Sequence, residues 1–136
     1  MSNEAPRTTV MEETLPASTI LATTTIEIGE VQEAGVVSAA SYFPVSNITG
    51  AASPASRDIS IINKGQDGNG ATVVAVLHLL SGVNPLDFDK TAMTLSATPA
   101  NLAVAAGDVL AVTSVPVGGT GLVDPGGRVE VEIHRS

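Results

Sequence analysis

The sequence contains no cysteine and no tryptophan, and its only aromatic residues are Tyr42, Phe43 and Phe88. Without cysteine the chain can form neither disulfide bonds nor thiol-based catalytic or zinc sites. We therefore expect a fold held together by an apolar core and compatible with a reducing cytoplasm. Because sugar-binding sites usually need an aromatic platform, the scarcity of aromatic residues argues against a lectin-type site.

Basic residues are also scarce. The chain has six lysines and arginines against 14 acidic residues, and its formal net charge is −8. The six basic positions form no run: they are Arg7, Arg57, Lys64, Lys90, Arg128 and Arg135. Nucleic-acid binding draws most of its affinity from basic side chains on phosphates, so we exclude nucleic acid as a partner.

Long apolar stretches are absent as well. The longest, Val73–Leu80, is short and is interrupted by His78, so it does not predict a membrane span. The first twenty residues lack a basic end followed by an apolar core, so we expect no secretory signal. These observations predict a soluble protein that is made in the cytoplasm and has no membrane partner.

What the chain does have is an excess of small apolar residues. Hydrophobic residues make up 43% of the sequence and charged residues only 15%. So few charges cover the surface of a small domain poorly, which predicts that part of the surface is buried against other chains. The alternative is a merely bland surface, rich in Thr, Ser and Ala.

The clearest pattern lies near the C-terminus. Residues Arg128–His134 alternate between apolar and polar side chains, as expected for a strand with one dry face. Val109–Val115 is apolar on both sides, and we expect the two segments to form a closing ribbon across the loop Pro116–Gly127. Other predicted strands are Thr19–Ile28, Gly35–Val45, Arg57–Asn63, Ala71–Leu80, Thr91–Ser96 and Leu102–Val104.

With no convincing helix, these strands predict an all-β fold, an antiparallel β-sandwich or jelly-roll-like domain over residues 19–136. Ala71–Leu80 is nearly apolar on both faces, so we expect it to be the most buried strand and central in its sheet.

Residues 1–18 have no clean periodicity and are interrupted by two prolines. They predict a flexible or extended N-terminal arm. Spaced apolar anchors at Val10, Met11 and Leu15 are compatible with an arm that binds a partner; a passive tail is the alternative.

A turn is predicted at Asp67, Gly68, Asn69 and Gly70, between two β-segments. Both glycines suit positive φ, and the turn should join antiparallel neighbours. A calcium loop would need further oxygen ligands and a closing glutamate, but an apolar segment follows, so we predict no metal site.

No pattern of catalytic residues is present. No serine lies in a Gly-x-Ser-x-Gly elbow, and His78 has no second histidine or cysteine beside it, so we expect a hydrogen-bonded core or interface residue there. We predict no catalytic residues, no cofactor and no enzymatic activity.

In composition and layout the chain resembles the head-decoration (cement) proteins of tailed bacteriophages. The segments that carry the resemblance are ISIINKGQDGNGATVVAVL, VAAGDVLAVTSV and GTGLVDPGGRVEVEI. The resemblance implies a structural virion protein that binds the major capsid protein on the outer surface of an icosahedral shell. It also implies a homo-oligomer, with a trimer favoured, and an N-terminal arm on the shell.

Two alternatives remain at this point. One is another virion β-protein, such as a tail or fibre component. The other is a carbohydrate- or protein-binding β-sandwich module outside a virion.

Overall fold

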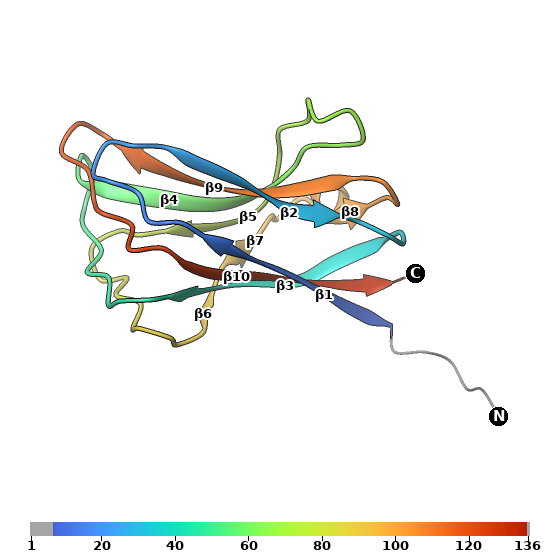
Figure 1. Ribbon diagram of the computed structural model, residues 1–136, viewed down its shortest axis with the longest axis horizontal. Helices are drawn as coiled ribbons and strands as arrows, with labels where there is room; N and C mark the ends of the chain where they lie inside the picture. The colour runs from blue at the N-terminus through green and yellow to red at the C-terminus, as the bar shows by residue number, and fades with distance from the viewer. Residues whose placement is uncertain (1–6, 136) are drawn as a thin grey trace.

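Two antiparallel sheets face each other in the computed structural model, which describes residues 7–135 (Figure 1). The first sheet has the order β1-β10-β3-β6, with β8 also paired to β3. Its strands are β1 (Thr8–Leu15), β10 (Gly127–Arg135), β3 (Gly35–Pro44), β6 (Thr91–Ala92) and β8 (Ala103–Val104).

The second sheet has the order β2-β9-β4-β5-β7. Its strands are β2 (Thr24–Glu30), β9 (Val109–Val117), β4 (Ser56–Asn63), β5 (Thr72–His78) and β7 (Thr94–Leu95). The single helical element in the described residues is a 3₁₀ turn, η1 (Pro99–Asn101). The prediction of an all-β antiparallel sandwich is confirmed.

The core lies between the sheets and follows from the alternation seen in the sequence. Val129, Val131 and Ile133 of β10 point inward and are buried, whereas Arg128 and His134 of the same strand are exposed. Burial of each such side chain stabilises the fold by about 1.5–3 kcal/mol. Facing them across the core is the second sheet, with Ile59, Ile61, Val74, Leu110 and Val112.

The predicted closing ribbon is wrong. β9 and β10 do not pair: β9 lies between β2 and β4 in the second sheet, and β10 lies between β1 and β3 in the first. The loop that joins them therefore crosses from one sheet to the other. The apolar pattern fixed which residues are buried but carried no information on which strand each segment meets.

The prediction for Ala71–Leu80 is also wrong. β5 pairs along its length with β4 but meets only the two-residue strand β7 on its other side. Val73 and Leu80 are exposed, so this segment is neither central nor the most buried. The apolar run therefore includes side chains that face solvent, at Val73 and Leu80, as well as side chains that are buried in the core.

The sandwich begins earlier than the predicted boundary at residue 18. All eight residues of β1 are in register with β10, from Thr8 opposite His134 to Leu15 opposite Gly127. The second half of the predicted arm is therefore an edge strand, and the prediction is wrong for residues 8–15; residues 1–6 lie outside the described part.

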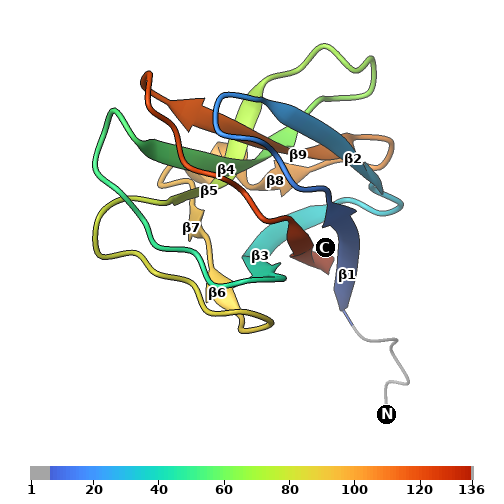
Figure 2. The same cartoon turned by 60° about the vertical axis from the view of Figure 1, so that its left-hand side comes forward.

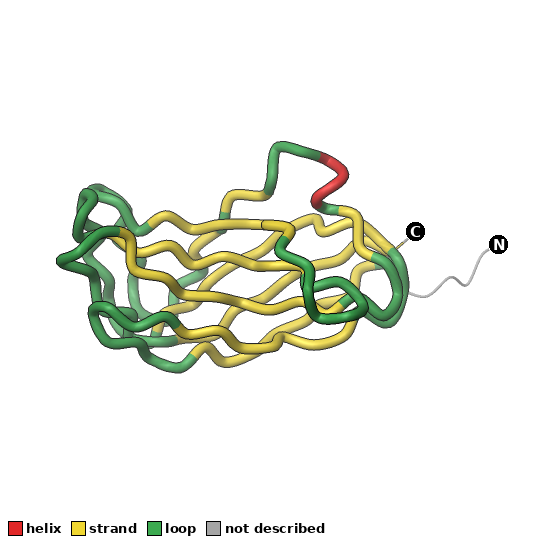
Figure 3. The backbone as a smooth tube through the Cα atoms, turned by 90° about the horizontal axis from the view of Figure 1, so that it is seen from above, coloured by secondary structure: helices red, strands yellow, loops and turns green. Residues whose placement is uncertain are grey.

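The connections gather at two ends of the sandwich (Figures 1 and 2). At one end lie the four loops 16–23, 45–55, 79–90 and 118–126, which we call the loop end. At the other lie the connections 31–34, 64–71 and 105–108, which we call the turn end. Seen from above, the strands run between these two sets of connections (Figure 3).

Candidate binding surface

Exposed apolar side chains concentrate at the loop end. Of the ten large apolar residues that are exposed in the described chain, seven lie in its four loops. They are Ile20, Leu21, Val45, Leu80, Leu86, Phe88 and Val123. A gathering of this kind is typical of a surface that meets another molecule, whereas scattered single residues would need no explanation.

The most prominent part is formed by two loops that meet side by side. Ile20 and Leu21 come from the loop 16–23 and Val123 from the loop 118–126, with exposed fractions of 45%, 61% and 50%. Together with Ala17 and the aliphatic part of Thr19 they line a shallow apolar depression. We call Ile20, Leu21 and Val123 the apolar tip.

Arg57, at the start of β4, is hydrogen-bonded to the backbone of both loops that carry the apolar tip. Its side chain is fully buried, and its guanidinium donates five hydrogen bonds of 2.7–3.1 Å. One goes to the Ser114 hydroxyl, and the other four go to the backbone carbonyls of Thr19, Ile20, Ala22 and Leu122. A single side chain thus satisfies carbonyls from both loops that carry the tip.

Asp124 closes the cluster from the other side and is also fully buried. Its Oδ1 accepts hydrogen bonds from the Tyr42 hydroxyl at 2.7 Å and from the Gly126 amide at 2.9 Å, and its Oδ2 accepts one from the Ser114 hydroxyl at 2.7 Å. Its backbone amide and carbonyl both bond to Ser18. Tyr42 belongs to β3 of one sheet and Ser114 to β9 of the other, so Asp124 ties both sheets to both loops.

The ionisation of this cluster is set by its burial. Desolvation raises the pKa of Tyr42, and the neighbouring negative charge of Asp124 and its hydrogen bond raise it further. Desolvation also lowers the pKa of Arg57, an effect that the charges of Asp124 and Tyr42 oppose. An arginine and a carboxylate linked through Ser114 compensate each other, and this keeps both charges tolerable inside the protein.

Close backbone contact completes the construction. Gly121, with φ of 68°, lies against the next loop so tightly that a Cβ there would overlap the Ile20 side chain and carbonyl. Only glycine fits this position. The two loops that carry the tip are therefore packed against each other, and their backbone carbonyls are hydrogen-bonded to a buried side chain.

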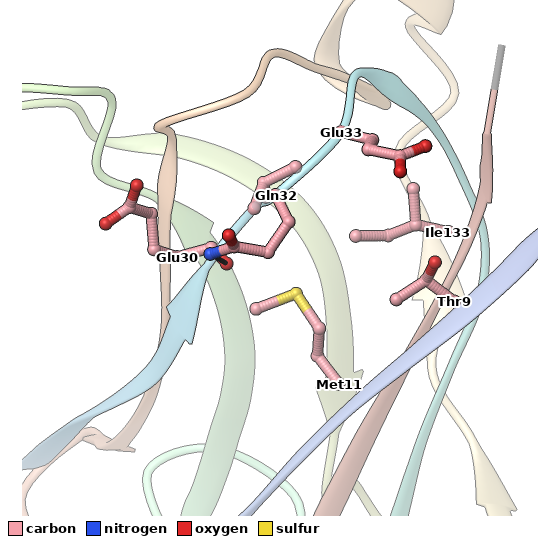
Figure 4. Close-up of a pocket in the computed structure, with 7 residues that line it drawn as sticks. Thr9, Met11, Glu30, Gln32, Glu33 and Ile133 are labelled. Atoms are coloured by element: carbon pink, nitrogen blue, oxygen red, sulfur yellow. Dashed lines mark hydrogen bonds between the residues drawn. The ribbon is translucent and has the colours of Figure 1, made fainter.

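Two of the predicted arm anchors contact this chain's own interior. Leu15 is buried in the core, and Met11 packs against it from β1. Figure 4 shows Met11 pointing from β1 towards Glu30 and Gln32, beside a cavity of about 90 Å³ between the edges of the two sheets. Val10 alone is exposed on the outer face. Deletion of residues 1–18 would therefore remove strand β1 of the sandwich, so it could not test whether this segment acts as a separate binding arm.

The residues of the predicted turn, Asp67, Gly68, Asn69 and Gly70, lie in the connection 64–71, which joins the antiparallel neighbours β4 and β5. Gly68 has φ of 80°, and Asp67 Oδ1 accepts a hydrogen bond from the Asn69 amide at 3.0 Å. Gly70 does not have positive φ; it is required instead because a Cβ there would lie 2.8 Å from the Asn63 carbonyl.

His78 is hydrogen-bonded, as predicted, but it does not lie in the core of this chain. Its side chain is about half exposed, and its Nδ1 lies 2.7 Å from Asp58 Oδ1 on the adjacent strand β4. The pair is a surface contact across two strands.

Comparisons with known proteins give no relative for this chain: no family model, no curated protein and no solved structure matches it. Within residues 7–135 there is no group of three or more His, Asp or Glu side chains arranged to hold a metal ion. The same residues include no helix long and apolar enough to cross a membrane. The apolar tip, with the buried Arg57 and Asp124 beneath it, is therefore the candidate functional site.

Proposed function

We propose that this chain is a structural virion protein that binds the outer surface of an icosahedral phage shell and cements its capsomers. The observation that carries the proposal is the apolar tip, in which three exposed apolar side chains stand on loops whose backbone is hydrogen-bonded to the buried Arg57 and Asp124. A pre-ordered apolar surface binds without a large loss of loop entropy. That property suits a protein whose task is attachment.

The order of the strands supports the proposal. In the jelly-roll form of the sandwich, the first and last strands are neighbours, and successive strands alternate between the sheets except at one central hairpin, which here is β4 and β5. The orders β1-β10-β3-β6 and β2-β9-β4-β5 have this interleaving, which supports a jelly-roll-like domain. Jelly rolls are common in viral capsid proteins and in lectins.

Charge supports an external position. With a net charge of −8, the chain would be repelled by packaged DNA, and its attachment on the outside avoids this. We propose the major capsid protein as its partner and a homo-oligomer, with a trimer favoured, as its assembled form. Several tips on one oligomer would then bind the shell together, and avidity would make up for the small area of each.

The test measures binding of the purified protein to shells that were assembled from the major capsid protein of the same phage without this chain. Leu21→Glu and Val123→Glu each place a charge on the apolar tip. Because both positions are exposed, neither change should alter the melting temperature. Binding in a sedimentation assay should weaken by about tenfold or more, since an unpaired charge would be buried in the contact.

Val36→Glu is the matched control. Val36 is exposed to a similar extent as Ile20, but it lies on β3 near the turn end. Binding of this variant should equal that of the wild type. Undiminished binding by Leu21→Glu would show that the contact surface lies elsewhere than the apolar tip. Failure of the wild-type protein to bind the shells would overturn the proposed cementing function.

A further inference from the structure

We propose a second binding site at the loop end: the pocket between Phe43, Phe88 and Arg128 receives an aromatic or large aliphatic side chain of a partner peptide that is flanked by lysine or arginine. The pocket has a volume of about 390 Å³ and is also lined by Thr14, Val45 and Gly127. It lies on the outer side of the first sheet, and its residues are different from those of the apolar tip. This volume is at the lower end of the range of about 300–1,000 Å³ that is usual for ligand pockets.

The floor of the pocket is a stacked pair. The guanidinium of Arg128 lies over the Phe43 ring, 4.2 Å from its centroid. Two carboxylates hold it there: Glu12 at 3.5 Å and Glu130 at 3.2 Å. About half of the Arg128 side chain remains exposed, so a flat surface is left open for a further planar or apolar group.

Phe88 forms the wall, and its position is unusual. It is 74% exposed and is the one non-glycine residue with positive φ, at 58°, among the described residues. A bulky residue with positive φ is in a strained conformation, which persists only where the surrounding structure imposes it. Here the Phe88 amide donates to the Pro44 carbonyl at 2.7 Å, and the Asp87 amide donates to Asn47 Oδ1 at 2.8 Å. The backbone of Phe88 is therefore held beside the pocket, with the ring exposed.

Charge identifies the flanking residues of the partner. Glu12, Glu13, Thr14 and Arg128 line an adjoining hollow, which shares Thr14 and Arg128 with the pocket. Arg128 already contacts both Glu12 and Glu130, so the carboxylates beside the pocket outnumber the nearby cation. Asp87 and Asp89 flank Phe88 in sequence and Lys90 follows them, so this segment adds one net negative charge. Lysine or arginine next to the inserted side chain is the complement.

A peptide fits better than a sugar. A sugar site needs several hydrogen-bonding groups around its aromatic platform, and the pocket lining offers only the Thr14 hydroxyl and Arg128 for this purpose. The proposal does not depend on the capsid as partner, because the site can be tested on the isolated protein.

The experiment is an NMR shift titration of the full chain with capped tripeptides, at up to about 10 mM because a single side-chain contact is weak. The probe is Lys-Phe-Lys, and the comparison peptides are Lys-Ala-Lys and Glu-Phe-Glu. We expect shifts at the amides of Phe43, Phe88 and Arg128 with Lys-Phe-Lys, and binding weaker by about fivefold or more with each comparison peptide.

Variants separate the pocket from the rest of the loop end. Phe88→Ala should weaken Lys-Phe-Lys binding by about fivefold or more, and Arg128→Lys, which keeps the charge but loses the planar group, should weaken it too. Leu86→Ala is the matched control, since Leu86 is exposed in the same loop but does not line the pocket. Its binding should be unchanged, as should that of Leu21→Ala on the tip.

Three results would overturn the proposal. The first is the absence of shifts around the pocket with Lys-Phe-Lys. The second is equal binding of Glu-Phe-Glu, which would remove the stated charge of the partner. The third is undiminished binding by Phe88→Ala. None of them bears on attachment to a shell through Leu21 and Val123, so the two proposals can fail separately.

Discussion

The two ends of the sandwich are built in opposite ways. The loop end has long connections with apolar side chains outside and a charged cluster, Arg57 and Asp124, inside. The turn end has polar connections whose side-chain hydrogen bonds lie at the surface. The Asn69 amide donates to Asp67 Oδ1, the Ala105 amide donates to Asp108 Oδ2, and Gln66 Nε2 donates to the Ala106 carbonyl of the neighbouring connection. At the loop end fully buried polar groups order the loops from within, whereas at the turn end exposed polar groups bond within the connections and between them.

This difference bears on function. Loops normally run over the surface and are the most mobile parts of a domain. A loop whose carbonyls are bonded to a buried arginine loses that freedom, at the cost of desolvating a charge. The contrast indicates that the loop end maintains a defined surface shape, whereas the turn end serves to reverse the chain direction between strands. The following predictions test the contrast, from the largest expected effect to the smallest.

Arg57→Met should have the largest effect. The change keeps most of the side-chain volume but leaves four loop carbonyls without their donor and removes the positive charge that interacts with the buried Asp124. Removal of one member of a buried charged pair typically costs about 3–5 kcal/mol. Urea unfolding should show this loss in the free energy of unfolding. A loss below about 1 kcal/mol would mean that the cluster does not hold the loops.

Two glycines compare the ends directly. Both have positive φ, but a Cβ at Gly118 of the loop end would overlap the backbone of Pro54, whereas a Cβ at Gly68 of the turn end meets nothing within 4 Å. Gly118→Ala should therefore lower the free energy of unfolding by more than about 2 kcal/mol, and Gly68→Ala by only about 1 kcal/mol, the cost of the strained φ. Equal losses in urea unfolding would contradict the contrast.

Tyr42→Phe should cost about 1–3 kcal/mol, because it leaves Asp124 with one hydrogen bond fewer in a buried place. Tyr42 is the only tyrosine, so tyrosinate absorbance reports on it alone. Its pKa in the folded state is raised, whereas an unfolded tyrosine ionises near pH 10. Stability from this group should be complete below about pH 10 and should fall above it.

The corresponding measurement is an absorbance titration. Tyrosinate should appear only together with the loss of folded structure by circular dichroism. Ionisation near pH 10 in the folded protein would show that the Tyr42 hydroxyl is open to water.

Asp67→Ala should have the smallest effect. The side chain is exposed at the turn end and accepts one local hydrogen bond from Asn69. Its loss should change the free energy of unfolding by about 0.5–1 kcal/mol. A loss as large as that of Tyr42→Phe would show that the turn end depends on its polar groups to the same degree.

Most strands could be predicted from the sequence, because alternation and turn residues act locally. The predicted segments Gly35–Val45 and Arg57–Asn63 differ from β3 and β4 by a single residue at an end. The β1 strand was missed because its inward positions include Thr9 and Glu13, which lie at an open edge and need not be apolar. Pairing partners were not predictable either, since no local pattern states that β9 and β10 belong to different sheets.

The support of the apolar tip was not predictable for a related reason. Alternation places Arg57 on the same face of its predicted strand as Ile59 and Ile61, but an arginine at a strand end is ordinarily expected to reach solvent, and Asp124 lies in a glycine-rich loop. Nothing in their spacing indicates that they share a buried cluster with Tyr42, because Asp124 comes 67 positions after Arg57 in the chain. Arginine and aspartate are seldom fully buried, so composition favoured the surface for both.

Native-state hydrogen exchange measures the central claim, that the loop end is rigid. The amides of Ser18, Asp124 and Gly126 are hydrogen-bonded within the buried cluster, whereas the amide of Asn69 bonds to an exposed side chain at the turn end. Our account predicts that the three loop amides exchange only with large-scale unfolding, and that Asn69 exchanges rapidly. If all four exchanged equally fast, the loop end would be as mobile as an ordinary turn, and the account would be contradicted.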